Sequence, residues 1–585
     1  MAAVTRVKHL GKHLLPAPVR RRWSQRRHEQ QAVLADQQRR QRIAHRHTQL
    51  RETDAQVRTV THEHQEIVGR TVTHFRVSEA SAHNLHLVTA ALQAADIDYF
   101  LIPGRVPTRH VVGIHREDKK RALDALREHY DNSAVYAAKP GSQGTIAVGP
   151  AAYVDGALPR AVKSAQTIRF AEYLLGPQDQ VLSGLDCGCD LEFWRDGAQL
   201  LDEVRAGTSG VDLSRLRVQV PEEVFRESLV APRPNQVADL LPHSQAKPAT
   251  RTVAGVEHPT FHAFTQPRVR SVNFPIDVVY TWVDGRDPQH AAKRERYRDE
   301  SVPQDTRASG ASRYISHDEL KYSLRSLQMY APFVRHVYLV TDDQVPEWLD
   351  PHSSWVTVVD HRDIHAEPEA LPVFNSHAIG TQLHHIPGLS EHYLYFNDDV
   401  FVGRPVQPEH FFHANGIAQI PFSPAQFGIG DPYPGEPAPN SAGKNVRELL
   451  EQTHGRYITH KFKHAPHPQL RPVLEELEQR FAEDVARTAR ARFRDPSDIG
   501  MAATLHHHYA MLTGRAVPAD IRLRYIDIGA ADAHAKLSSL QASRDYDVFC
   551  LNDVDTSPER REEVSAILHT FLETSFPFPS PAERR

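Results

Sequence analysis

The chain has 585 residues, of which 40% are hydrophobic and 24% charged, and its formal net charge is −4. This length suffices for about two to four domains, and the composition is that of a soluble globular protein. The near-neutral charge argues against a protein that binds polyanions through bulk charge. Only three cysteines are present, which excludes a disulfide framework and fits a reducing compartment.

The first 50 residues are strongly basic: they hold 12 Lys and Arg against Glu29 and Asp36, a formal charge of +10. We treat residues 1–60 as a basic N-terminal extension. It is either a solvated, partly helical segment or an arm that contacts anionic lipids at the inner face of the cell membrane. No nucleic-acid-binding motif is recognisable, so nucleic acid is not expected as a partner.

Membrane-spanning and export signals are not apparent in the sequence. No stretch approaches the roughly 20 apolar residues that a spanning helix needs, and the N-terminus lacks the apolar core of a secretory signal. We therefore expect a cytoplasmic protein, with peripheral membrane contact through residues 1–50 as the alternative.

Residues 75–230 predict an accessory α/β domain, smaller than the region that follows. Leu85, Val88 and Leu92 have helical spacing, and several apolar runs have the length of strands. The expected strands are 97–104, 109–115, 144–150 and 189–194, and the second expected helix is 116–130. Residues 231–274, rich in Pro, His, Thr and Gln, predict a linker.

The region 275–585 predicts an α/β domain with a mainly parallel sheet flanked by helices, of the Rossmann-like or nucleotide-sugar-transferase-like kind. Apolar strands alternate with helices, as in sheets covered on both faces. Ser316 and Glu319 form a capping box at the start of one helix. The expected strands are 276–285, 335–343, 355–363 and 393–399.

Each of these four strands has an aspartate at or near its end, and two have an aspartate pair there. In a parallel sheet the carboxyl ends share the edge where open α/β sheets bind ligands. Clustered carboxylates there suit a divalent cation and the phosphates bound to it. The alternative is that Asp is a common turn residue after a strand. The aspartates are Asp284, Asp342, Asp343, Asp360, Asp398 and Asp399.

Four sequence blocks resemble the Stealth family of bacterial sugar-phosphate transferases, whose animal relatives are the lysosomal-enzyme N-acetylglucosamine-1-phosphotransferases. The blocks are 276–288 (IDVVYTWVDGRDP), 312–349, 374–406 and 494–518, and the tail 547–581 is also similar. The resemblance covers about half the chain and leaves residues 1–270 unexplained. It implies transfer of a sugar 1-phosphate from a nucleotide-sugar, expected to be UDP-linked, to a glycan hydroxyl in exopolysaccharide or capsule synthesis, with release of a nucleoside monophosphate.

By this resemblance, Asp398 and Asp399 bind Mg²⁺ or Mn²⁺, and Asp399 is also catalytic. Asn397 orients the pair or touches the sugar phosphate. Asp284 contacts the nucleotide or the metal. Trp282 lines the nucleotide pocket, or else belongs to the core, since strand residues alternate between faces.

The resemblance also assigns the general base to His464, because a neutral imidazole accepts protons near pH 7. His467, three residues later, is the alternative base and a candidate substrate-binding residue. Arg494 matches the cationic group that binds phosphoryl oxygens in a bidentate fashion. Lys463 and Arg492 are the alternatives, and the structural alternative for Arg494 is a salt bridge to Asp495 or Asp498.

In the second block, we read Arg325 as phosphate-facing and Glu319 mainly as a helix cap. The third block departs from the family pattern: it reads Ala-Ile-Gly where relatives read Ala-Ile-Glu. Gly380 therefore removes a carboxylate near the reaction centre, and His377, His384 or His385 are candidates to compensate.

Three hypotheses follow for the function. The first is a nucleotide-sugar-dependent phosphotransferase that acts on a polysaccharide or sugar acceptor. The second is a metal-dependent glycosyltransferase, which also uses acidic strand ends on an α/β fold. The third is a catalytically silent protein that binds a glycan or nucleotide-sugar, with Gly380 as the mark of lost chemistry.

Overall fold

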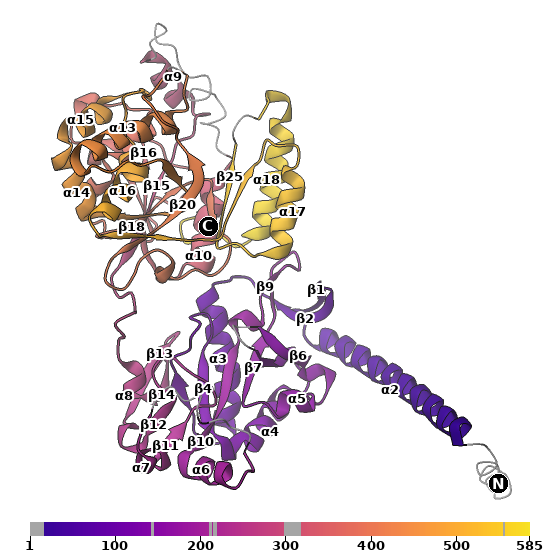
Figure 1. Cartoon of the computed structure of the whole chain (residues 1–585). Helices are drawn as coiled ribbons and strands as arrows, with labels where there is room; N and C mark the ends of the chain where they lie inside the picture. The colour runs from indigo at the N-terminus through magenta and orange to yellow at the C-terminus, as the bar shows by residue number, and fades with distance from the viewer. Residues whose placement is uncertain are drawn as a thin grey trace, which may run out of the picture. The chain divides into compact units, whose positions relative to one another are not determined.

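The structure is a computed structural model that describes residues 17–141, 145–209, 213, 219–297, 317–433, 435–553 and 556–584. The chain forms two compact units (Figure 1). The first consists of Met1–Val72 with Glu79–Thr265, and the second of Thr73–Ser78 with Gln266–Arg585. The second unit contains all the predicted site residues.

The first unit is built on a mixed sheet with the strand order β13–β14–β3–β4–β10–β7–β5–β6. Helices α3 (Val77–Ala94) and α4 (Lys119–Tyr130) contribute Leu85, Val88 and Leu126 to its buried core, so the predicted α/β character is confirmed. The strands are β3 (Phe100–Ile102), β4 (Val111–His115), β5 (Val135–Pro140), β6 (Ile146–Ala152), β7 (Thr167–Glu172), β10 (Cys189–Asp196), β13 (Pro248–Val253) and β14 (Val256–Phe261).

Smaller elements surround this sheet. A second sheet has the order β1–β2–β8–β9, and β11 and β12 extend the main sheet from β10. Their bounds are β1 (Val57–His62), β2 (Gln65–Thr71), β8 (Leu174–Leu175), β9 (Val181–Ser183), β11 (Ser228–Val230), β12 (Leu240–Pro242), α5 (Arg160–Lys163), α6 (Gly197–Arg205), α7 (Glu222–Arg226) and α8 (His262–Thr265).

The predicted linker 231–274 is wrong for most of its length. Strands β13 and β14 form an antiparallel hairpin around Ala254–Gly255, and Thr260 of β14 pairs with Leu101 of β3. The hairpin lies at the edge of the sheet, and most of the β13 side chains face solvent. Its polar composition therefore resembles that of a loop, although all six residues of β13 pair with β14.

Within the basic extension, Ala17–Thr53 form one long helix, α2, whose last turns are not free in solvent. Arg46 pairs with Asp131 at 3.0 Å, His47 contacts Asp155 at 2.7 Å, and Leu50 is buried in the first unit. The remainder of α2 extends away from the body of that unit (Figure 1). Within the described part of the chain, no helix is both long and apolar enough to cross a membrane.

The second unit contains the predicted sheet, in the order β17–β16–β15–β18–β22. The first four strands are parallel and β22 is antiparallel, which confirms a mainly parallel α/β architecture. Two three-stranded sheets, β19–β25–β24 and β21–β20–β23, complete the β-structure. The strands are β15 (Ile276–Thr281), β16 (Val334–Thr341), β17 (Val356–Asp360), β18 (His392–Asn397), β19 (Val400–Val402), β20 (Ala418–Gln426), β21 (His460–Phe462), β22 (His467–Leu470), β23 (Ala516–Ala519), β24 (Leu523–Asp527) and β25 (Val548–Asn552).

Helices flank the sheets of this unit (Figure 1). Helix α10 begins at Glu319 after Asp318, whose φ of 64° is left-handed; Ser316 of the predicted capping box lies outside the described residues. The helices are α9 (Pro288–Arg296), α10 (Glu319–Tyr330), α11 (His361–Ile364), α12 (Ser376–Gly380), α13 (Ala438–His454), α14 (Arg471–Arg480), α15 (Ala482–Arg490), α16 (His506–Leu512), α17 (Ala533–Ser543) and α18 (Arg561–Ser575).

Candidate active site

The Asp398–Asp399 pair stands at a junction between two sheets. The run Tyr393–Phe396 is buried in β18, and the chain turns at the aspartates into β19, which pairs with β25. The backbone oxygen of Asp399 accepts a hydrogen bond from the amide of Leu551 at 2.9 Å. The C-terminal part of the chain therefore forms one wall of the aspartate turn.

The Asp399 carboxylate is surrounded by donors. Its Oδ1 lies 3.2 Å from Nε2 of His464, and its Oδ2 accepts hydrogen bonds from Asn552 at 2.9 Å and Cys550 at 3.3 Å. Burial alone would raise the pKa of Asp399, but the His464 imidazole and the other donors outweigh burial and hold the pKa below its usual value. Asp399 is therefore ionised.

The pKa values of Asp398 and Glu319 are shifted upward, in the direction opposite to that of Asp399. Burial, the charge of Glu319 and the charge of Asp399 raise the pKa of Asp398 well above its usual value. Burial also raises the pKa of Glu319 to about 7, although Glu319 accepts a hydrogen bond of 2.6 Å from the amide of His317. Carboxylates that resist joint ionisation are stabilised by a cation, and oxygen donors suit Mg²⁺ or Mn²⁺. Asp398 and Glu319 thus supply the kind of oxygen donor that the predicted divalent metal takes.

His464 lies between β21 and β22, where its ring contacts the aspartate turn. Its Nε2 is 3.2 Å from Asp399 and 3.0 Å from the side-chain amide of Asn397. Asp399 is ionised and its carboxylate can only accept, so the hydrogen of the ring lies on Nε2, and Nδ2 of Asn397 is the second neighbour of that nitrogen. Burial lowers the pKa of His464, but Asp399 outweighs burial and raises it above its usual value. When the ring is neutral, its hydrogen is on Nε2 and Nδ1 is the nitrogen with the free lone pair.

His467, itself half-buried, is hydrogen-bonded to a pair of buried histidines, His506 and His507. The amide of Leu470 donates to Nε2 of His506 at 2.9 Å, so His506 carries its hydrogen on Nδ1 and donates to Nδ1 of His507 at 3.0 Å. His507 in turn donates from Nε2 to Nδ1 of His467 at 2.9 Å. The neutral His467 ring therefore has its hydrogen on Nε2.

This arrangement makes His467 a poor proton acceptor. Burial and the charge of His464 lower the pKa of His467 to about 3, and its Nδ1 lone pair is already used. Its ring is stacked against Tyr395, with centroids 6.3 Å apart. His467 is better suited to donate a hydrogen bond than to act as a base.

Arg494 is held at the start of α12, where its Nη2 donates to Oγ of Ser376 at 3.0 Å. Burial raises the pKa of Tyr395, Asp398 and Asp399 raise it further, and Arg494 lowers it. The arginine and the aspartate pair therefore act on the same phenol. The alternatives are engaged elsewhere: Lys463 pairs with Asp520, and Arg492 stacks on Tyr297 at 4.8 Å.

The structure corrects the phosphate-facing interpretation of Arg325. Its guanidinium is buried and forms a bidentate ion pair with Glu583, at 2.8 and 2.7 Å. It also donates to the backbone oxygen of Phe576 at 3.0 Å. Arg325 thus fastens the C-terminal segment to α10. Glu319 is more than a helix cap, because its charge acts on Asp398.

The acidic strand ends do not form a single cluster. Asp342 pairs with Lys293 at 2.9 Å. Asp360 caps α11 and pairs with Arg362 at 2.8 Å, and Arg362 also reaches Asp343 at 3.2 Å. The turn-residue interpretation is therefore right for β16 and β17, and the predicted four-strand cluster is wrong there.

Asp284 and Trp282 lie beside this edge without a direct contact to the aspartate pair among the described interactions. Asp284 accepts a hydrogen bond from the amide of Arg286 at 2.9 Å and is held by Gln344. Trp282 is half-buried, and its backbone amide donates to Val340 at 3.0 Å. Their roles in nucleotide binding stay predictions.

At the third block, the histidines do not replace the missing carboxylate of Gly380. His384 and His385 both contact Glu478, and Nδ1 of His377 lies 3.6 Å from Asp498. A Cβ atom at position 380 would meet only Ala502, at an ordinary 3.6 Å. The backbone at position 380 therefore accepts a Cβ atom without a clash.

Sequence reasoning missed three contributors to the site: Glu319 as a charged neighbour, Cys550 and Asn552. A signal for the last two was present. The run FCLND (549–553) repeats the pattern of LYFND (394–398), an apolar strand that ends in Asn-Asp. Both strand ends meet at Asp399.

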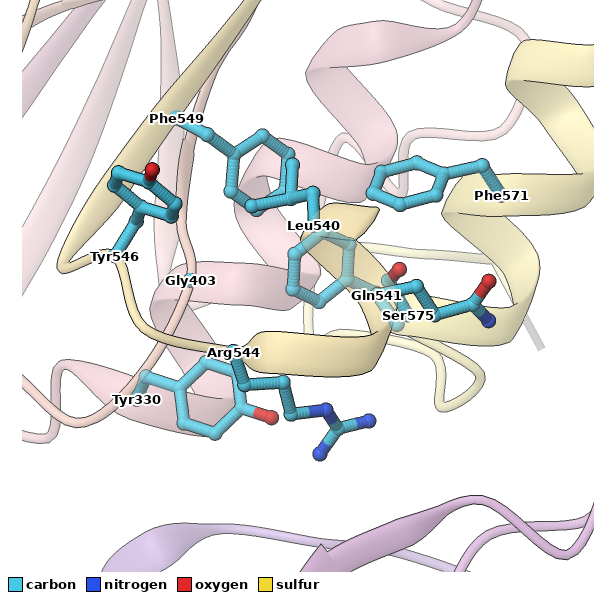
Figure 2. Close-up of a pocket in the computed structure, with 10 residues that line it drawn as sticks. Tyr330, Gly403, Leu540, Gln541, Arg544, Tyr546, Phe549, Phe571 and Ser575 are labelled. Carbon is cyan, nitrogen blue, oxygen red and sulfur yellow. The ribbon is translucent and has the colours of Figure 1, made fainter. Parts of the chain in front are cut away.

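A separate pocket lies between β25, α17 and α18 (Figure 2). Aromatic rings dominate it, among them Tyr330, Phe549 and Phe571, and no predicted site residue lines it. It is therefore distinct from the candidate active site.

Comparison with known proteins identifies the family of this chain. Models of the Stealth protein family match conserved region 1 at residues 274–302, region 2 at 313–420, region 3 at 463–511 and region 4 at 538–585. Regions 2, 3 and 4 contain Asp399, His464 and Asn552. The galactosyltransferase LgtC, solved with donor and acceptor sugar analogs, covers 50% of this chain and 95% of its own at 12% identity, but the TM-score of 0.24 says nothing about function.

Curated relatives match over most of the chain. The exopolysaccharide phosphotransferase SCO2594 of Streptomyces coelicolor is 41% identical over 86% of this chain and 84% of its own length. SCO6023 of the same organism is 40% identical over 89% and 84%. CpsY of Mycobacterium tuberculosis is 36% identical over 62% and 68%. The chain therefore belongs to the Stealth family of phosphotransferases.

Proposed function

We propose that the protein transfers a sugar 1-phosphate from a nucleotide-sugar, expected to be a UDP-sugar, to a hydroxyl of a polysaccharide or sugar acceptor. The observation that carries this proposal is the His464–Asp399 pair, 3.2 Å apart, beside Asp398 and Glu319. His464 can accept the proton of an attacking hydroxyl, and the neighbouring carboxylates can bind a cation that is complexed with a diphosphate. The names of the relatives, exopolysaccharide phosphotransferases, support an exopolysaccharide as the acceptor.

In the proposed reaction, Nδ1 of His464 takes the proton of the acceptor hydroxyl. Asp399 fixes the ring through Nε2 and stabilises the imidazolium that forms, as a carboxylate does behind a catalytic histidine. The acceptor oxygen forms a bond to the sugar-bearing phosphorus, the pyrophosphate P–O bond breaks, and the nucleoside monophosphate leaves. Arg494 would bind phosphoryl oxygens of the transferred group.

Asp398 and Glu319 are the better candidates to hold Mg²⁺ or Mn²⁺, since both oxygens of Asp399 already contact donors. When bound, the cation would neutralise charge on the diphosphate. This assignment refines the predicted Asp398–Asp399 metal site, with Asp399 mainly as the residue that orients His464.

The decisive experiment is incubation of the purified protein and Mg²⁺ with a panel of nucleotide-sugars, with and without a polysaccharide acceptor. Release of UMP from a UDP-sugar supports the proposed reaction. Release of UDP would instead identify a glycosyltransferase, which breaks the glycosidic bond. Binding of nucleotide-sugar without turnover would favour the silent binding protein.

A further inference from the structure

A second group of potential metal ligands lies outside the candidate active site. His384 and His385 follow α12, and Glu478 belongs to α14. One carboxylate oxygen, Oε2 of Glu478, lies 3.0 Å from Nε2 of His384 and 3.1 Å from Nε2 of His385. Two imidazole nitrogens thus converge on a single oxygen.

The hydrogen-bond partners of His385 indicate that a proton or a metal ion lies between its Nε2 and Glu478. Nδ1 of His385 lies 2.9 Å from the backbone oxygen of Ile364, which can only accept, so Nδ1 carries the hydrogen. In a neutral His385 ring, the Nε2 lone pair would then face the Glu478 carboxylate. Two acceptors at this distance repel each other unless a proton or a metal ion lies between them. The bond from His385 to a backbone carbonyl is also the usual support behind a metal-bound histidine.

The geometry suits zinc better than magnesium. Ligands about 2.0–2.1 Å from a tetrahedral Zn²⁺ lie roughly 3.3 Å apart, close to the two separations seen here. Imidazole nitrogens favour Zn²⁺ over Mg²⁺, which prefers oxygen. The His384 side chain is fully buried, whereas His385 and Glu478 are 28% and 32% exposed. An ion could therefore enter from solvent and keep a fourth ligand of water.

We propose that His384, His385 and Glu478 bind a zinc ion that braces the sheet of the second unit. Residue His392 of β18 pairs with Leu470 of β22, and the segment before β18 and the helix after β22 supply the three ligands. The ion would join these two segments at the start of β18. Asp398 and Asp399 lie beyond the other end of β18, a strand about 20 Å long by its rise per residue.

This proposal does not depend on the proposed phosphotransferase reaction. A zinc ion here would stabilise the fold whether or not the aspartate turn is catalytic. The competing state is an ion pair in which His385 is protonated and no metal binds. Burial lowers the pKa of His384, whereas the contact with Glu478 raises the pKa of His385. A metal-free pair of protonated His385 and ionised Glu478 therefore also satisfies the hydrogen-bonding groups, and the experiment must distinguish it from the zinc site.

The test uses the full-length protein freed of metals with a chelator and then titrated with Zn²⁺ and with Co²⁺. Because Asp399, His464 and Cys550 could also bind a soft metal, the titrations are made in an Asp399→Asn background. We expect one equivalent of Zn²⁺ to bind and to raise the thermal unfolding midpoint. Bound Co²⁺ should show tetrahedral d–d absorption without a thiolate charge-transfer band, which would mark Cys550 instead.

Glu478→Gln and His385→Gln should each weaken Zn²⁺ binding by at least about 10²-fold, since even partners behind metal ligands contribute 10- to 100-fold. Glu483→Gln, on an exposed position of α15, is the control and should bind like the parent. Both ligand variants are at partly exposed positions, and circular dichroism would verify that they fold. Absence of Zn²⁺ binding in the parent, or equal binding in the ligand variants, would overturn the zinc site and leave the ion pair.

Discussion

Nε2 of His464 lies 3.2 Å from Oδ1 of Asp399, although 65 positions separate the two residues. The carboxylate fixes which ring nitrogen carries the hydrogen, so Nδ1 is the nitrogen that can accept a proton. This relationship connects the base predicted from sequence with the predicted acidic pair. It also gives the two residues different roles, proton acceptor and orienting group.

Replacing His464 by alanine should therefore remove the base and leave the nucleotide-sugar site intact. We expect turnover to fall by about 10²–10⁴-fold with nearly unchanged donor affinity. Monophosphate release and donor binding by calorimetry measure the two effects. His460→Ala, at an exposed ring four residues earlier, is the control; an equal loss there would mean that the segment was merely disturbed.

The carboxylates Asp398 and Glu319 should make activity depend on a divalent cation. We expect chelation with EDTA to abolish turnover reversibly, and Asp398→Asn to lower it by about 10²-fold, because a neutral amide cannot replace the carboxylate charge. Mg²⁺ or Mn²⁺ added back should restore the EDTA-treated enzyme. Full activity without added metal, or in Asp398→Asn, would contradict the metal assignment.

Arg494→Lys tests whether the fork of the guanidinium is needed. A lysine keeps the charge but not the bidentate geometry, so we expect turnover to fall by about 10-fold or more in the assay for monophosphate release. Arg492→Lys is the matched control, since Arg492 stacks on Tyr297. Equal activity of Arg494→Lys and the parent would leave Arg494 as a structural contact of Ser376.

The buried histidines should make the second unit sensitive to acid. Burial lowers the pKa of His506 to about 3, whereas an unfolded histidine titrates near 6.5. Below pH 6.5 the unfolded chain binds one more proton at this residue, so its contribution to stability is present at pH 7 and decreases as the pH falls. The free energy of unfolding should lose roughly 1.4 kcal/mol per pH unit below 6.5.

Urea unfolding at pH 7 and pH 5 measures this effect. His506→Gln should lower stability at both values but reduce the difference between them by about 2 kcal/mol, from the same slope over 1.5 units. His413→Gln, at an exposed position, should keep the full difference. An unchanged difference in His506→Gln would show that the acid sensitivity arises elsewhere.

Removal of residues 1–40 tests membrane contact by the basic helix. Arg46, His47 and Leu50 anchor the end of α2, so the cut must stay before them. We expect unchanged turnover and weaker sedimentation with anionic liposomes at low salt, since each basic residue near such a surface contributes up to about 1 kcal/mol. Equal sedimentation of both forms would identify α2 as a solvated extension.

The strands that could be predicted from the sequence are those whose apolar residue pattern matches their burial in the structure. The strands β15, β16, β17 and β18 are apolar runs buried in a parallel sheet, so their composition identifies them. The edge hairpin β13–β14 was missed because its exposed residues are polar. In such a strand, hydrogen bonds to a neighbour and not apolar burial determine the structure.

For the site, local motifs predicted Asp398, Asp399 and His464 but not their distant neighbours. Asn552 meets Asp399 across 153 positions, and no spacing rule connects them. Arg325 shows the converse error: its sequence position suggested a phosphate, whereas Glu583, 258 positions away, is its partner. Long-range pairing is set by topology, which a single sequence does not reveal.

The contact between Asp399 and Asn552 also has a consequence for biosynthesis. At about 5–20 residues per second, a ribosome needs roughly 8–30 s to make the chain between them. During that time β18 can join the parallel sheet, but β19 has no β25 to pair with and the Asp399 carboxylate lacks two of its donors. The nascent protein must therefore carry an unpaired strand edge until late in its synthesis, and that interval is when it most needs protection from aggregation.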